Sequence, residues 1–154
     1  LSTNDTSGNA AQLSFAGQGC TSRAQSPSLK VRAKLDATTQ VLAVLAGLYG
    51  DPDNLVEILY DATTSAGNFR YRCVSGGTET LVDSGKAADT AYHLFALRLD
   101  GAAGTGTFSI DGASIQTLST HVPTSVLEPR LGIQTREAVD KRLTVDLVHP
   151  ESGR

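Results

Sequence analysis

Hydrophobic and polar residues alternate along most of this chain. In residues 28–36 the apolar side chains take every second position, namely Leu29, Val31, Ala33 and Leu35. Charged side chains fill the positions between them, and the same period of two recurs in residues 92–100 and 143–147. In an extended chain this period places successive side chains on opposite faces, so the pattern predicts half-buried β-strands.

Turn-forming residues divide the alternating segments about every 8 to 15 residues, a spacing typical of all-β sandwiches and barrels. Asp111-Gly112 tolerates the positive φ angles of a two-residue type I′ turn and predicts a hairpin. Residues 136–141 suit an exposed loop or one helical turn. We expect about eleven strands, at residues 12–16, 28–36, 40–48, 55–60, 68–74, 79–83, 91–99, 105–111, 113–120, 127–135 and 142–148.

The chain has 154 residues, of which 40% are hydrophobic, which is enough for a single core. We expect a polar N-terminal arm at residues 1–11, a β-sandwich domain at residues 12–150 and a C-terminal tail at residues 151–154. The arm lacks packing residues of its own, so we expect it to become ordered against a partner.

Charge and hydropathy exclude two classes of partner. The net charge is -3, and the lysines and arginines are scattered along the chain, which gives no basic patch for nucleic acid. No apolar run approaches the roughly 20 residues of a membrane-spanning helix. We therefore expect neither nucleic acid nor a membrane as a partner.

Two segments resemble a known family. Residues 92–101 (YHLFALRLDG) and 106–112 (GTFSIDG) are similar to a hairpin of laminin-G-like and concanavalin A-like sandwiches, and residues 143–148 (LTVDLV) resemble the closing strand of that fold. The resemblance implies a concanavalin A-like jelly roll made of two antiparallel sheets.

The segment ETLVDSG at residues 79–85, together with Ala91-Tyr92-His93 and Ile110-Asp111-Gly112, looks most like domains of bacteriophage virion proteins. This resemblance implies a non-enzymatic capsid decoration (cement) protein on the virion surface, assembled in the host cytoplasm. It would form a homo-oligomer, a trimer in our expectation, and contact the major capsid protein or other virion subunits. The alternative is a lectin-like, glycan-binding domain of a phage tail or fibre adhesin or of a secreted protein.

Candidate catalytic groups are few. A glycosidase needs two carboxylates beside the sugar, commonly as Glu-x-Asp-x-x-Glu on one strand, and this triplet is absent. The nearest acidic pair, Glu57 and Asp61, is better explained as structural. No Gly-x-Ser-x-Gly motif marks a nucleophile. We therefore expect no enzymatic activity and no catalytic residue.

Three histidines lack the short spacing of a preformed metal site: His93, His121 and His149. We expect His93 to be buried beside Phe95 with a hydrogen bond to a backbone carbonyl, and His149 to be exposed. Cys20 and Cys73 are favoured as two buried thiols, although a disulfide stays open.

Residues 51–54 (DPDN) offer three oxygen-bearing side chains, so either calcium or a simple Asx turn would explain them, and the turn is favoured. The Gly-rich segment 101–106 is not followed by a helix and is expected to be a hairpin loop rather than a phosphate site. We expect no metal and no cofactor.

Aromatic side chains are too scarce to favour sugar binding. The chain has no Trp and has four tyrosines, Tyr49, Tyr60, Tyr71 and Tyr92. We expect Tyr60 and Tyr71 to pack in the core with their hydroxyls in water.

Overall fold

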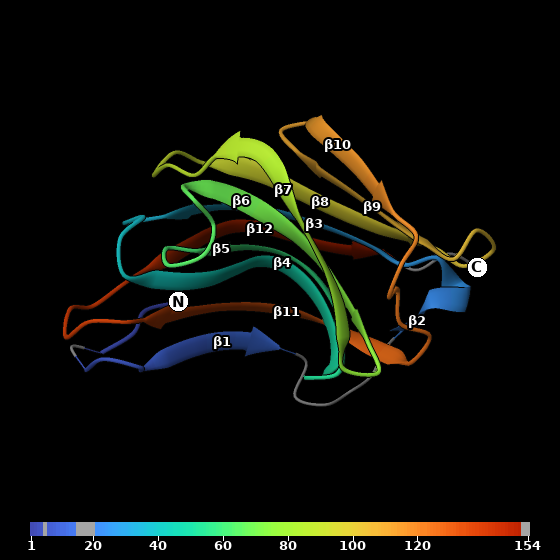
Figure 1. The fold of residues 1–154 in the computed structure, drawn as a ribbon. Helices are drawn as coiled ribbons and strands as arrows, with labels where there is room; N and C mark the ends of the chain where they lie inside the picture. Colours follow the sequence, from blue (N-terminus) through green and yellow to red (C-terminus); the bar gives the residue numbers. More distant parts are fainter. Residues whose placement is uncertain (5, 15–20, 152–154) are drawn as a thin grey trace.

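A computed structural model describes residues 1–4, 6–14 and 21–151. The larger of its two antiparallel sheets contains seven strands: β1 (Ala10–Ser14), β2 (Thr21–Ser22), β4 (Val41–Asp51), β5 (Asn54–Asp61), β6 (Asn68–Ser75), β7 (Thr78–Ala87) and β11 (Val126–Thr135). The smaller sheet contains five strands: β3 (Ser28–Leu35), β8 (His93–Asp100), β9 (Thr105–Ile110), β10 (Ala113–Leu118) and β12 (Leu143–Glu151). The expected all-β jelly-roll sandwich is confirmed (Figure 1).

The order of the strands shows how the chain crosses between the layers. The larger sheet runs β1-β11-β4-β5-β6-β7, with β2 paired to β11, and the smaller sheet runs β10-β9-β8-β3-β12. Each of the eleven predicted strands has a counterpart within a few residues. The strand β2 and the short 3₁₀ helix Arg23–Gln25 were not predicted, because two or three residues are too short to establish a period.

The core lies between the sheets and is built from alternate side chains of both. Phe69 of β6 is its aromatic centre, with ring-centroid distances of 6.1 Å to Tyr60, 5.6 Å to His93 and 5.1 Å to Phe95, all in edge-to-face geometry. The ring of Tyr71 stacks on Phe108 at 5.1 Å. Such pairs add to the hydrophobic burial that holds the two sheets together.

The hairpin between β9 and β10 has the predicted turn, since Asp111 and Gly112 have φ angles of 56° and 71°. Residues 136–141 contain no helix. No helix of the described residues is long and apolar enough to cross a membrane.

The start of the chain lies against its own sandwich. The amino group of Leu1 donates to the carbonyl of Leu143 at 2.9 Å, and the backbone N–H of Thr3 donates to the carbonyl of Lys141 at 2.9 Å. Ala10 already pairs with Gln134 across β1 and β11. The expected arm is thus ordered, where described, by backbone hydrogen bonds within the chain, while the boundaries at residues 11 and 150 stay predictions.

Gly101, the residue after β8, packs closely against the backbone of the short 3₁₀ helix. A Cβ at Gly101 would lie 2.6 Å from the carbonyl oxygen of Arg23 and 2.9 Å from Cα of Ala24. We expect Gly101→Ala to lower the free energy of unfolding by about 1–3 kcal/mol, because backbone atoms must shift. Gly132→Ala is the control, since its Cβ would meet nothing closer than 3.6 Å. Urea denaturation compares the two variants, and equal stability would contradict the clash.

Candidate functional site

On the outer face of the larger sheet, the side chains of β5 are shielded from solvent. Val56, Ile58 and Tyr60 point into the core, so the alternate residues point away from it: Leu55, Glu57, Leu59 and Asp61. Although they face outward, their exposed fractions are only 6%, 7%, 6% and 9%. The strands of this sheet curve strongly (Figure 1). A cavity of about 110 Å³ lies on the same face beside Arg130 and Gly132.

Glu57 lies at the centre of this face in a row of charged residues. The strand register places Glu57 between Gly47 of β4 and Arg72 of β6, and Arg130 of β11 follows Gly47. Nη1 of Arg72 donates to Oε1 of Glu57 at 3.2 Å, while Nε of Arg72 donates to Glu79 at 3.0 Å. The guanidinium of Arg72 on β6 therefore joins two carboxylates on the strands that flank it, β5 and β7.

Gly47 leaves the backbone open beside Glu57. A Cβ at this position would lie 3.0 Å from the carbonyl oxygen of Arg130, 3.0 Å from Cγ1 of Val44 and 3.5 Å from Cβ of Glu57. Any side chain at position 47 would fill the space between Glu57 and Arg130, so glycine keeps that space available.

Burial raises the pKa of Glu57 above its usual range, even though the charges of Arg72 and Arg130 act in the opposite direction. A carboxyl group that keeps its proton more readily than an ordinary glutamate can donate that proton in a reaction. This is the property that general acids of glycosidases require.

A second carboxylate, Glu128 of β11, lies on the same face and is 8% exposed. It pairs with Tyr49 of β4, which in turn pairs with Leu55 of β5. Glu128 therefore lies two strands from Glu57, about 10 Å across the sheet, and two residues, about 7 Å, further along the strands. The ring of Tyr49 lies under the guanidinium of Arg130 at 4.0 Å. Glu128 was not predicted as a site residue, and its one signal in the sequence is its position out of phase with the core residues Leu127 and Leu131.

Asp61 lies on the same outer face as Glu57, as the spacing of four residues implies. Both of its carboxylate oxygens, however, already accept hydrogen bonds from structural partners. Oδ1 accepts hydrogen bonds from the backbone N–H of Thr63 at 2.9 Å and from its hydroxyl at 2.7 Å. Oδ2 accepts one from Arg136 at 2.7 Å. Asp61 thus holds the turn after β5.

His93 occupies the expected place but has unexpected partners. It is 5% exposed and lies beside Phe95 with a ring-centroid distance of 6.0 Å. Its Nδ1 is 2.6 Å from Oδ2 of Asp111 and its Nε2 is 3.0 Å from Oδ1 of Asp89. The predicted bond to a backbone carbonyl is wrong, because the turn after β9 and the loop before β8 bring carboxylates to both ring nitrogens.

These two aspartates make stability depend on pH. Partial burial raises the pKa of Asp111, but hydrogen bonds from the Leu94 N–H and His93 outweigh it and hold the pKa below its usual range. The hydrogen bond from the Ala91 N–H, with a smaller one from His93, lowers the pKa of Asp89.

A carboxylate with a lowered pKa stabilises the fold above its unfolded pKa and loses that contribution as the pH falls through its folded pKa. We expect the melting temperature to fall steeply below about pH 4. In the Asp89→Asn/Asp111→Asn double variant this fall should be shallower, whereas Glu151→Gln should keep the original profile. Identical profiles for all three proteins would refute the assignment to these aspartates.

The remaining candidates have structural partners. Nδ1 of His121 lies 2.8 Å from the hydroxyl of Thr80. The side chain of His149 is 54% exposed, as predicted. Tyr60 and Tyr71 are buried, as predicted, but their hydroxyls donate to the carbonyls of Thr38 at 2.7 Å and Ser114 at 2.6 Å instead of to water. Burial raises the pKa of Tyr71 to about 12.

The acidic turn 51–54 has the Asx geometry. Oδ1 of Asp51 accepts from the backbone N–H of Asp53 at 2.8 Å and from the side chain of Asn54 at 3.1 Å. Among the described residues, no three His, Cys, Asp or Glu side chains gather where they could hold a metal ion.

Cys73 is a buried free thiol, and Cys20 lies outside the described residues. Segment 101–104 is a turn between β8 and β9, as predicted.

Comparison with solved structures finds the same fold in several proteins named as glycosyl hydrolases or a transglycosylase. No protein-family model and no curated protein matches the sequence. A β-glucanase of Bacillus licheniformis matches with a TM-score of 0.68 and 14% identity over 100% of this chain and 77% of its own. The Crh5 transglycosylase matches with a TM-score of 0.68 and 17% identity, over 99% of this chain and 72% of its own. For a native glycosidic hydrolase the TM-score is 0.63 and the identity 12%, over 80% of this chain and 64% of the hydrolase, so this chain spans less than two thirds of it.

These matches correct two expectations. Several solved structures with this fold are named as glycosyl hydrolases and one as a transglycosylase, and nothing found ties the chain to bacteriophage virion proteins. The expectations of a non-enzymatic capsid decoration protein and of a chain without enzymatic activity are therefore wrong. The expected trimer, capsid partner and virion location stay untested. What the matches share with this chain is the concanavalin A-like jelly-roll fold.

Proposed function

We propose that this chain is a carbohydrate-active domain that binds a β-glucan across the outer face of the larger sheet and hydrolyses it there. The observation that carries the proposal is Glu57, a carboxyl group with a raised pKa and 7% exposure on the outer face of this sheet. The names of the similar structures, which include a β-glucanase and a lichenase, suggest the class of substrate.

In this proposal Glu57 is the general acid and Glu128 is the second carboxylate. A sugar ring lying over Gly47 and Tyr49 of β4 would have Glu57 of β5 on one side, opposite Gly47, and Glu128 of β11 on the other side, opposite Tyr49. Glu57 gives its proton to the glycosidic oxygen as the bond to the anomeric carbon breaks. Glu128 takes a proton from the water that attacks that carbon, and a proton returned to Glu57 closes the cycle.

Two other polar groups would position the substrate. The guanidinium of Arg72 holds Glu57 through Nη1, and Arg130 covers the ring of Tyr49 beside the open backbone of Gly47. Guanidinium groups provide several fixed donors, which suits the hydroxyl oxygens of sugars.

The experiment is an assay of reducing ends released from mixed-linkage β-1,3-1,4-glucan, with β-1,3-glucan and starch in parallel. We expect new reducing ends from one of the β-glucans and none from starch. Absence of cleavage of both β-glucans over a wide range of pH would overturn the proposed activity.

A further inference from the structure

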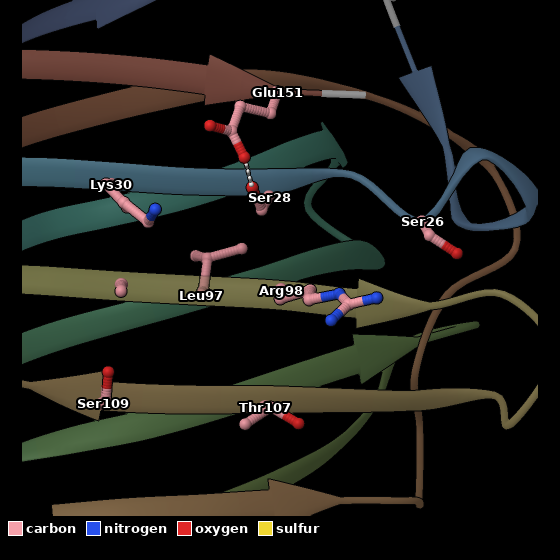
Figure 2. Close-up of a pocket in the computed structure, with 9 residues that line it drawn as sticks. Ser26, Ser28, Lys30, Leu97, Arg98, Thr107, Ser109 and Glu151 are labelled. Carbon is pink, nitrogen blue, oxygen red and sulfur yellow. Dashed lines mark hydrogen bonds between the residues drawn. The ribbon is translucent and has the colours of Figure 1, made fainter. Parts of the chain in front are cut away.

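The outer face of the smaller sheet carries a second cavity of about 440 Å³ (Figure 2). Its lining is mostly hydroxyl and cationic, formed by Ser26, Ser28, Lys30, Arg98, Thr107 and Ser109. These residues come from β3, β8, β9 and the turn before β3. The volume lies within the range of roughly 300–1,000 Å³ that is common for small-molecule sites.

The strand register explains how this cavity forms. Ser28 of β3 lies directly opposite Arg98 of β8. In the next row Lys30 lies opposite Ala96, and Ala96 lies opposite Ser109 of β9. Because Ala96 carries only a methyl group, it leaves a depression in the surface between the ammonium group of Lys30 and the hydroxyl of Ser109.

The two cationic side chains of the lining are those of Lys30 and Arg98. Within the part of the chain that the structure describes, neither Lys30 nor Arg98 forms an ion pair, whereas the neighbouring Arg32 is paired with Asp146. Glu151 is the carboxylate of the lining, and it is bonded to Ser28 at 3.0 Å and to His149 at 3.1 Å. Two unpaired cations beside hydroxyl groups are complementary to a ligand that has both a negative charge and hydroxyls.

We propose that this cavity binds a uronic acid unit of an acidic polysaccharide, with the sugar carboxylate between Lys30 and Arg98 and the sugar hydroxyls at Ser28, Thr107 and Ser109. Nucleic acid fits less well, because none of the described residues that line the cavity has an aromatic side chain on which bases could stack. The site belongs to the sheet opposite to Glu57 and does not depend on the proposed hydrolysis.

The test is isothermal titration of the whole chain with a uronic acid trisaccharide and with the same trisaccharide after reduction of its carboxyl groups. We expect binding of the acidic sugar, weakened by salt, and much weaker binding of the neutral one. Lys30→Gln and Arg98→Gln should each raise the Kd about tenfold, since each removes a charge-assisted contact. Arg142→Gln removes the same charge from a side chain that is 69% exposed and paired with Asp140, so it should leave the Kd unchanged.

Several results would overturn this site. These are equal affinity for the neutral trisaccharide, equal weakening in Arg142→Gln, absence of binding at millimolar sugar, or equal affinity for a single-stranded oligonucleotide. Melting curves of the Lys30 and Arg98 variants should match that of the unchanged chain. Glu57→Gln should bind the acidic sugar normally, which separates this site from the proposed hydrolytic one.

Discussion

Replacing Glu57 with glutamine should lower the rate of β-glucan hydrolysis by about a thousandfold. Glutamine keeps the shape of the side chain but has no proton to give to the glycosidic oxygen. The fold should survive, because the amide removes the cost of burying a charge and Arg72 keeps its bond to Glu79. The measurement is kcat on the β-glucan that the unchanged chain cleaves.

Glu79→Gln is the matched control, since Glu79 also bonds to Arg72 but its side chain is 50% exposed. We expect its kcat within about threefold of the original. If Glu57→Gln retained most of the activity, or if both variants lost it equally, Glu57 would not be the proton donor. Activity should also fall as the pH rises through the pKa of Glu57, because only the protonated carboxyl can act as the acid.

Replacing Phe69 with alanine should cause the largest loss of stability, about 3–5 kcal/mol. Phe69 is 1% exposed and makes edge-to-face contacts with Tyr60, His93 and Phe95, so its removal leaves a cavity between the sheets. For a domain of this size the melting temperature should fall by about 10 °C.

Ile115→Ala is the control for the loss of Phe69, because Ile115 is also hydrophobic but 66% exposed. We expect its free energy of unfolding to change by less than about 0.5 kcal/mol. Equal effects of the two substitutions in urea denaturation would show that the contacts between the sheets at Phe69 contribute little.

Alternation along the chain was sufficient to predict the sandwich, because strands such as β3 and β8 bury one face and expose the other. Residues 28–36 became β3 (Ser28–Leu35) and the Asp111-Gly112 pair became a type I′ turn. Two residues are too few to show a period, so β2 (Thr21–Ser22) could not be predicted from the sequence.

The candidate site was harder to predict, because it depends on register and curvature. The sequence analysis searched for paired carboxylates on one strand and set Glu57 aside when that motif was missing. Glu128 reaches the same face through two strand pairings, which local spacing does not contain. The curvature that buries Glu57 on an outward-facing position is likewise a property of the whole sheet. The hydrogen-bond partners of His93 could not be predicted for the same reason. Asp89 lies in a loop and Asp111 in a turn, and only the fold brings their carboxylates to the ring, where a backbone carbonyl was expected.

The outer faces of the two sheets carry different sets of polar side chains. The outer face of the larger sheet has a buried acid, a second carboxylate and an open glycine, which are suited to bond cleavage. The outer face of the smaller sheet has cations and hydroxyls without a comparable acid, which are suited to holding an acidic chain. A polysaccharide that carries both neutral and acidic units could contact both faces of one molecule.

The central claim is that a β-glucan binds over Gly47 within reach of Glu57, and a crystal structure of the Glu57→Gln variant with a β-glucan oligosaccharide tests it most directly. We predict sugar density across β4 and β5 on the outer face of the larger sheet, with a glycosidic oxygen within hydrogen-bond distance of the side chain at position 57. Sugar density found elsewhere on the molecule, with the outer face of the larger sheet empty at saturating oligosaccharide, would contradict the claim.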